Sequence, residues 1–272
     1  MRLGLSSYTY GWAVGVKGSS PASPVDEHGL LDHAREHGVK LLQIGDNLPL
    51  HTFAETRLDR FAKRAASEGV QIEVGARGLT VEQVATYATI ARTVGATLVR
   101  FVIDDAGFQP SAAEVTAILR ECAPLLDRLT LGIENHDRFP AAKLREMIDA
   151  AGSDRIGVCL DTANSFGGGE GLDTVLAALA PLAVNLHIKD FHIERVPWLM
   201  GFSVTGRPAG RGFLDVRALL AQLAPFGRCH TAILELWTPP EAQLADTIAK
   251  EAAWAAESLD FLRPLFTQSA PP

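Results

Sequence analysis

Eight short apolar runs recur along this chain, and their regular spacing is what most restricts the fold. The runs cover residues 3–7, 41–45, 71–75, 98–102, 129–134, 156–161, 184–189 and 231–236. Their first residues are 27 to 47 positions apart, which is the length of one strand, one helix and the two loops that join them. The sequence therefore predicts a repeated βα unit.

The segments between these runs carry helix signals. Three of them contain a capping box, in which a hydroxyl side chain and an acid or amide three residues later satisfy free backbone N–H groups. The boxes are Thr52-x-x-Glu55, Thr80-x-x-Gln83 and Ser111-x-x-Glu114. These patterns predict helices that begin between the strands.

Eight strands that alternate with helices close naturally into a (β/α)8 barrel, the TIM-barrel class of α/β fold. A doubly wound open sheet is the alternative, but it usually places a glycine-rich phosphate turn after an early strand. Here residues 8–12 read Tyr-Thr-Tyr-Gly-Trp, and the glycine cluster at 167–171 does not match that motif. No linker or change in composition divides the chain. We therefore predict a single barrel domain that spans residues 1–272.

The charge balance and the apolar pattern exclude two classes of partner. The chain has 25 Lys plus Arg against 32 Asp plus Glu, a formal net charge of −7. Nucleic-acid binding depends on clustered basic residues, and no basic run in this chain is longer than a pair. The longest apolar stretch, residues 175–184, contains Pro181 and is shorter than the roughly 20 residues that a membrane span needs. We expect neither nucleic acid nor membrane as a partner.

The cysteines and the first residues indicate a cellular location. Cys122, Cys159 and Cys229 are an odd number at wide spacing, which fits neither a disulfide framework nor a C-x-x-C site. The first six residues lack the charged and apolar regions of a secretory signal. We predict reduced thiols and a cytoplasmic protein.

Strands five to eight of the predicted barrel each end in one residue of a metal-binding type. These residues are Glu134, Asp161, His187 and Glu235. Side chains alternate between the two faces of a strand, so neighbours such as Ile133 and Leu160 face the helices while these four face the axis. Catalytic groups of TIM barrels lie at these C-terminal strand ends.

Three carboxylates and an imidazole on one axis require a cation among them. Two unit charges about 4 Å apart interact by about 4 kcal/mol at an effective dielectric constant of about 20, so the carboxylates alone would repel one another. Oxygen-rich ligation with one nitrogen favours a hard to borderline divalent ion. We expect Mn²⁺ first, and the sequence leaves Mg²⁺, Co²⁺ and Zn²⁺ open.

These motifs resemble the sugar phosphate isomerase/epimerase superfamily, whose members have a xylose-isomerase-like TIM barrel. The resemblance covers nearly the whole chain and is carried by Ile133-Glu134-Asn135, Leu160-Asp161-Thr162, His187-Ile188-Lys189-Asp190 and Leu234-Glu235. It implies that Glu134, Asp161, His187 and Glu235 hold the metal. It also implies that Glu134 and Glu235 are the catalytic acid and base, one on each face of the substrate.

The resemblance implies a divalent-metal-dependent isomerase or epimerase of a keto sugar or sugar acid, which acts through a metal-stabilised enediolate. The alternative is a lyase on the same scaffold. A 3-oxo sugar acid would lose CO₂, and a substrate with a β-hydroxyl would lose water, as in an inosose-type dehydratase. The motifs predict a metal-stabilised enediolate or enolate, and they leave open whether isomerisation, epimerisation, decarboxylation or dehydration follows.

One departure from the family pattern follows strand six. The family often has Leu-Asp-Thr-Gly-His, whereas residues 160–164 here read Leu-Asp-Thr-Ala-Asn. Asn164 cannot exchange a proton near neutral pH, so we expect it to act through hydrogen bonds. This weakens the epimerase interpretation and supports the lyase.

Five residues are predicted to contact the substrate, namely His136, Asn164, Lys189, Arg207 and Arg211. The two arginines lie in a long insertion after strand seven, and guanidinium groups bind carboxylate or phosphate through two hydrogen bonds. We therefore expect a small carbohydrate substrate that is anionic. The alternative is that these arginines are solvated or paired with Asp190 or Glu194.

The same insertion contains Trp198, Met200 and Phe202. This apolar stretch and the apolar helices leave room for a homo-oligomer in which a loop of one subunit closes the site of another.

Overall fold

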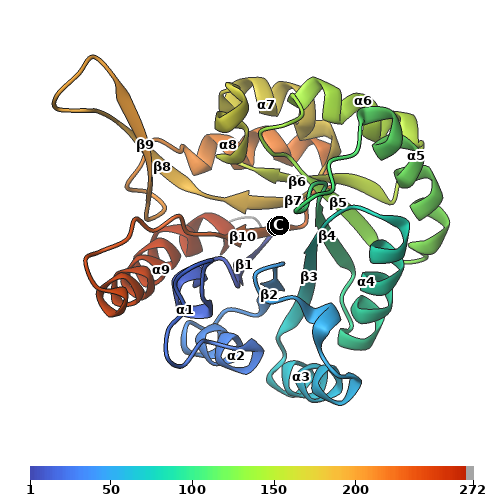
Figure 1. The fold of residues 1–272 in the computed structure, drawn as a ribbon, viewed down its shortest axis with the longest axis horizontal. Helices are drawn as coiled ribbons and strands as arrows, with labels where there is room; N and C mark the ends of the chain where they lie inside the picture. Colours follow the sequence, from blue (N-terminus) through green and yellow to red (C-terminus); the bar gives the residue numbers. More distant parts are fainter. Residues whose placement is uncertain (268–272) are drawn as a thin grey trace.

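The chain folds into a closed barrel of eight parallel strands (Figure 1). The computed structural model describes residues 1–267. The barrel strands are β1 (Arg2–Ser6), β2 (Leu41–Ile44), β3 (Gln71–Arg77), β4 (Leu98–Val102), β5 (Thr130–Glu134), β6 (Ile156–Asp161), β7 (Ala183–Ile188) and β10 (Thr231–Leu234). They lie in chain order around the barrel, and β10 closes it by pairing with β1. The predicted single-domain (β/α)8 fold is confirmed, and residues 268–272 of the predicted domain lie outside the described part.

Helices surround the barrel strands, as Figure 1 shows. They are α1 (Gly11–Val14), α2 (Glu27–Glu36), α3 (Glu55–Glu68), α4 (Val81–Val94), α5 (Ala112–Cys122), α6 (Ala141–Ala151), α7 (Leu172–Leu179), α8 (Val216–Leu223) and α9 (Leu244–Thr267). Short 3-10 turns lie at η1 (Leu50–Thr52), η2 (Ala123–Leu125), η3 (Asn164–Gly168), η4 (Ala180–Leu182) and η5 (Ala224–Phe226). Among the described helices, none has the combination of length and apolar character that a membrane-spanning segment needs.

Two of the three predicted capping residues begin a helix as expected. Ser111 caps α5 with a complete capping box, and Thr80 caps α4. The prediction at Thr52 was wrong, because α3 begins at Glu55 without a side-chain cap. The Thr52 hydroxyl donates instead to the Pro49 carbonyl oxygen at 2.8 Å, within the preceding 3-10 turn. Local hydrogen bonds of this kind compete with the capping arrangement.

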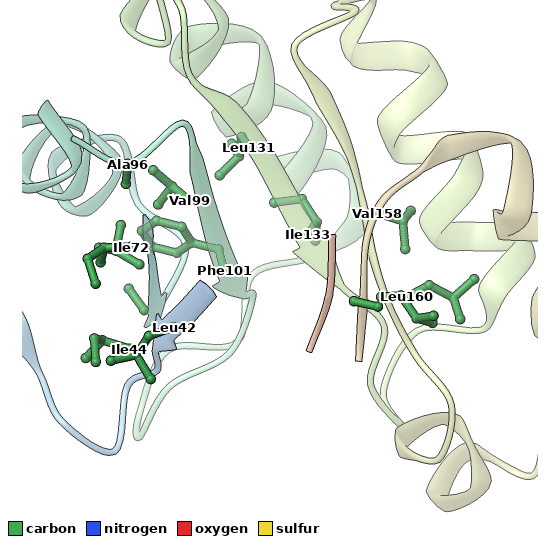
Figure 2. Close-up of a cluster of buried hydrophobic side chains, with 14 of the residues drawn as sticks. Leu42, Ile44, Ile72, Ala96, Val99, Phe101, Leu131, Ile133, Val158 and Leu160 are labelled. Atoms are coloured by element: carbon green, nitrogen blue, oxygen red, sulfur yellow. The ribbon is translucent and has the colours of Figure 1, made fainter. Parts of the chain in front are cut away.

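The apolar core lies between the strands and the helices. Outward-facing side chains of β2 to β6 fill it, and Figure 2 labels Leu42, Ile44, Ile72, Val99, Phe101, Leu131, Ile133, Val158 and Leu160. Burial of one such side chain contributes roughly 1.5–3 kcal/mol. Because the strand period is two, this layer forces the alternate residues to face the barrel axis.

Those inward-facing residues include a buried polar layer. Gln43, Glu73, Arg100 and Asn185 all lie inside the barrel and are buried. Branched aliphatic residues dominate the interior of most TIM barrels. Here the Glu73 carboxylate accepts hydrogen bonds from Gln43 at 3.0 Å and from Asn185 at 3.2 Å. Hydrogen bonds therefore hold this layer together, beneath the C-terminal strand ends.

An antiparallel hairpin interrupts the βα alternation between β7 and α8. Its strands are β8 (Asp190–Arg195) and β9 (Phe202–Arg207). Figure 1 shows it at the upper left, where it projects away from the barrel. The sequence predicted an insertion at this place but not these two strands.

Candidate metal centre

The structure brings the four predicted ligands together at the C-terminal end of the barrel. They are Glu134 at the end of β5, Asp161 at the end of β6, His187 on β7 and Glu235 directly after β10. One ligand atom from each lies within 4.8 Å of the others, and all four side chains are buried. We call these four residues the metal centre.

Pairing between neighbouring strands and a loop amide orient Asp161. Asp161 pairs with His187 across β6 and β7, which places both side chains at the same height on the barrel axis. The Asn135 side chain accepts from the Asp161 backbone N–H at 2.7 Å and donates to its carbonyl oxygen at 3.0 Å. Asp161 Oδ1 accepts the backbone N–H groups of Ala163 and Asn164 at 2.8 and 2.9 Å. These bonds direct Oδ2 toward the other ligands.

The donor set fits a divalent cation. His187 Nδ1 lies 3.5 Å from Glu134, 3.8 Å from Asp161 and 3.4 Å from Glu235, without a hydrogen bond to any described residue. Among residues 1–267, Asp161 Oδ2 and Glu235 Oε2 have the ammonium of Lys189 as their polar neighbour and otherwise face the other ligands. A ring nitrogen and several carboxylate oxygens that converge in this way are the donor set of a divalent-metal site.

A buried glutamine fixes which nitrogen of His187 is free. Gln43 Nε2 donates to Glu73 Oε2 at 3.0 Å and to Asn185 Oδ1 at 3.2 Å, so Gln43 Oε1 must face His187. The distance from this oxygen to His187 Nε2 is 2.7 Å, which requires a proton on Nε2. His187 Nδ1 is therefore the nitrogen that a metal would bind, in place of the second proton that Glu235 and Glu134 favour in the metal-free protein by raising the pKa of His187 against the effect of burial.

Two cations flank the metal centre, the buried Arg100 and the partly buried Lys189. Arg100 on β4 forms ion pairs with Glu134 and, at 2.6 Å, with Asp46. Lys189 Nζ lies 2.9 Å from Asp161 Oδ2 and 3.0 Å from Glu235 Oε2. The sequence motifs did not indicate Arg100, Asp46 or Gln43 as site residues, although a charged residue inside the apolar run 98–102 was a signal for Arg100.

These cations keep both glutamates ionised. Burial favours the neutral form of Glu134, but the Arg100 guanidinium and His187 outweigh it and hold its pKa well below the ordinary value. Burial acts on Glu235 in the same way, and His187 and Lys189 lower its pKa overall. The charges of the two carboxylates in turn hold the pKa of Lys189 well above its ordinary value, although burial opposes this.

Three of the five predicted substrate residues lie at the metal centre. Asn164 Nδ2 donates to Glu134 Oε1 at 2.7 Å, and Lys189 donates to Asn164 Oδ1 at 3.3 Å. His136 Nε2 lies 3.6 Å from Glu134 Oε1 and lines a cavity of about 170 Å³ beside it. Arg77, whose Nε contacts Asp46 at 2.7 Å, lines the same cavity.

The other two predicted substrate residues lie elsewhere. Arg207, on the hairpin, has its Nη2 3.7 Å from Glu194. Arg211 pairs with Glu257 of α9 at 2.5 Å and is largely exposed. Neither guanidinium contacts a metal-centre residue in the described part of the chain. For Arg207, the structure has the pairing with Glu194 that was the alternative to substrate binding.

Comparison with known proteins places these features in a family. The sequence model of the xylose isomerase-like TIM barrel family matches residues 31–265. The 3-oxo-isoapionate decarboxylase of Pectobacterium atrosepticum is 31% identical over 264 residues, which are 96% of this chain and 95% of that protein.

Solved structures share the fold at lower identity. D-psicose 3-epimerase from Clostridium cellulolyticum H10, solved with D-tagatose, is 14% identical with a TM-score of 0.73 over 97% of this chain and 99% of that one. A xylose isomerase-like TIM barrel protein from Mycobacterium smegmatis, solved with magnesium, is 16% identical with a TM-score of 0.70 over 95% and 96%. The chain therefore belongs to the xylose isomerase-like TIM barrel family, as its strand-end motifs predicted.

Proposed function

We propose that this protein is a metal-dependent decarboxylase of a 3-oxo sugar acid. The observation that carries the proposal is the pairing of each buried glutamate with a cation, Glu134 with Arg100 and Glu235 with Lys189. This reverses the order expected from the sequence, in which an isomerase or epimerase came first and a lyase second.

Epimerisation and decarboxylation make different demands on these glutamates. An epimerase needs one carboxylate to remove a proton from carbon and a second to return one, and a good base of this kind has a pKa near the working pH. Arg100 and His187 hold the pKa of Glu134 well below its ordinary value, which makes it a weak base. Decarboxylation needs no base, because the bond to the carboxyl carbon supplies the electron pair.

The proposed reaction converts a 3-oxo acid and one proton into CO₂ and a ketone. The bond between C2 and the carboxyl carbon breaks, its electron pair becomes the enolate of the C3 ketone, and a proton then adds at C2. A divalent ion bound by the metal centre would supply the positive charge that stabilises an enolate. Lys189 is placed to deliver the proton, since its ammonium lies at the metal centre and donates to Asn164. A divalent ion bound there would offset the charges of Asp161 and Glu235, which raise the pKa of Lys189, and would make its ammonium a better acid.

Similarity over the full chain supports this assignment. A relative that is 31% identical along 96% of the chain is a 3-oxo-isoapionate decarboxylase, whose name describes a 3-oxo sugar acid that loses CO₂. The decarboxylase and the isomerase or epimerase interpretations therefore both describe an enzyme that acts on a sugar derivative. Mn²⁺ remains our first proposal for the ion, ahead of Mg²⁺, Co²⁺ and Zn²⁺, on the basis of the three carboxylates and one imidazole.

The test is a product assay in D₂O with a panel of 3-oxo sugar acids and neutral keto sugars and the Mn²⁺-loaded enzyme. We expect CO₂ release from a 3-oxo acid, together with one deuterium on the ketone carbon that was C2 of the acid. Lys189→Met should lower the rate by about 10²- to 10⁴-fold, the usual contribution of a positioned proton donor. Lys143→Met, an exposed α6 lysine paired with Glu146, serves as the matched control and should keep the rate.

The other outcomes identify the alternatives. Deuterium uptake with the carbon skeleton intact would instead indicate the isomerase or epimerase, and loss of water would indicate the dehydratase. The epimerase is the second candidate because Glu134 and Glu235 do converge on one centre from different strands.

A further inference from the structure

The β8–β9 hairpin has one polar face and one apolar face. Residues that pair across its strands lie on the same face, and Ile193 pairs with Val204 while Arg195 pairs with Phe202. The Arg195 guanidinium lies over the Phe202 ring, 5.6 Å from its centre. We call Ile193, Val204 and Phe202 the apolar face. The opposite face carries the polar pairs His192 with Thr205 and Glu194 with Ser203.

The hairpin also ends in apolar side chains that nothing in the described chain covers. Trp198 is 75% exposed, Leu199 71% and Met200 84%, and Phe202 beside them is 66% exposed. An aromatic side chain such as Trp198 or Phe202 can bury about 150–250 Å², and together with Leu199 and Met200 these largely exposed side chains offer roughly 600 Å² of apolar surface. Patches of that size on a soluble protein usually mark an interaction site. We call residues 196–201 the hairpin tip.

A cleft of about 700 Å³ lies at the base of the same hairpin. Its lining includes Val204 from the apolar face, Trp12 of α1, Tyr8, and the β10–α9 loop at Trp237 and Pro240. Tyr8 donates to Asp46 at 3.0 Å, and Asp46 in turn binds Arg100. The cleft is therefore next to the metal centre, and one of its walls, Trp237, is 44% exposed.

The cleft extends from Val204 in the middle of β9 to Trp237, which packs against Gly206 at the base, so its far part lies about one hairpin length from the tip. Each hairpin strand has six residues, which is about 20 Å at roughly 3.3 Å per residue. When two such hairpins pack antiparallel about a two-fold axis, the tip of one reaches the base of the other. The surface is then self-complementary, as a symmetric dimer requires.

We propose that two copies of this chain form a two-fold dimer through the apolar faces of their hairpins, with each tip covering the cleft beside the partner's metal centre. Two patches of roughly 600 Å² give about 1,200 Å², which reaches the lower limit for a specific interface before any polar contact is counted. The tip then forms part of the wall of the partner's site and excludes water from it.

The first experiment measures the oligomeric state of the full chain by analytical ultracentrifugation across a dilution series. We expect a dimer, and we expect the double variant Trp198→Ser, Met200→Ser to raise its dissociation constant by more than about 30-fold, as loss of an interface hot spot does. Phe226→Ser is the matched control. Phe226 is also an exposed aromatic residue, but it lies in η5, before β10 and at the opposite end of the barrel. A monomeric wild-type protein, or a dimer that the tip variant leaves intact, would overturn the proposal.

The second experiment locates the tip. Trp198→Cys and Pro240→Cys are made as separate single variants, mixed, and oxidised. We expect a covalent dimer only in the mixture, because a disulfide needs Cα atoms within about 7 Å. Each variant alone controls for the native cysteines, of which Cys122 and Cys159 are buried. A covalent dimer from the Trp198→Cys variant alone would mean that the tips meet each other, which contradicts tip-to-cleft packing.

Discussion

The state of His187 depends on residues that are far away in the sequence. Its free nitrogen is set by Gln43, whose amide is oriented by Glu73 and Asn185. Outer contacts of this kind hold a metal-binding imidazole in the correct tautomer and orientation. Hydrogen bonds in the barrel interior thus orient His187 for metal binding.

We expect Gln43→Leu to weaken metal binding. The variant removes the acceptor that fixes the tautomer of His187. Loss of such a contact typically lowers metal affinity about 10- to 100-fold. Isothermal titration of the metal-free protein with Mn²⁺ measures the effect. Gln71→Leu is the control, because Gln71 lies at the start of β3 and bonds Arg2 outside the metal centre. Equal affinities for the two variants would contradict the role given to Gln43.

Arg100 compensates two buried carboxylates, so its loss should destabilise the metal-free protein. Arg100→Met leaves Glu134 and Asp46 buried without this partner, and removal of one member of a buried ion pair costs about 3–5 kcal/mol. Urea unfolding measures the change in the free energy of unfolding. Arg35→Met breaks an exposed pair with Asp32 at 2.7 Å, and there we expect a loss below about 1 kcal/mol.

At the scale of elements, α9 holds α1 through a buried carboxylate. Glu251 accepts the backbone N–H groups of Trp12 at 3.0 Å and Ala13 at 3.1 Å. These are among the first N–H groups of α1, which have no partner inside the helix. Burial of Glu251 raises its pKa to about 7, even though these hydrogen bonds lower it.

This raised pKa makes stability fall as the pH rises. The folded protein retains the Glu251 proton up to about pH 7, whereas the unfolded chain releases it near its ordinary pKa. The stabilisation is therefore complete at low pH and is lost as the pH rises through 7. Between about pH 5 and pH 8 we expect Glu251 to remove about 2–3 kcal/mol from the free energy of unfolding. Glu251→Gln should show a correspondingly smaller decrease, and parallel pH profiles for the two proteins would refute this.

The strands and helices were predictable where the signal was local. The eight barrel strands follow from apolar runs of fixed spacing, and the metal ligands follow from their position where four of those runs end. The hairpin was not predictable in this way, because its residues 190–195 and 202–207 alternate apolar and polar side chains over only a few positions. The α3 start was missed because Thr52 bonds within its own turn.

The rest of the site required the closed barrel. Gln43 and Asn185 are 142 residues apart and meet only across the barrel axis. Arg100 reaches Asp46, 54 residues away, for the same reason. Neither contact leaves a motif in the sequence.

At the scale of the whole molecule, metal binding should stabilise the fold. A ligand at about 100 times its dissociation constant adds roughly 2.7 kcal/mol if it binds only the folded state. For a chain of this size we expect Mn²⁺ to raise the melting temperature by about 5 °C, and EDTA to reverse the rise. Glu235→Ala should abolish the shift, whereas Glu257→Ala, on the exposed pair with Arg211, should retain it. A shift of equal size in the Glu235 variant would place the ion elsewhere.

The polar layer inside the barrel also governs how the sequence can change over evolution. In an aliphatic interior, one residue can replace another of similar volume. Here Glu73, Gln43 and Asn185 are each specified by the donors and acceptors of the others, so a single replacement leaves a buried group without its partner. Substitutions at these positions should therefore occur together in related proteins, as correlated pairs. In the outward-facing core around Phe101, by contrast, substitutions should occur at single positions, independently of one another.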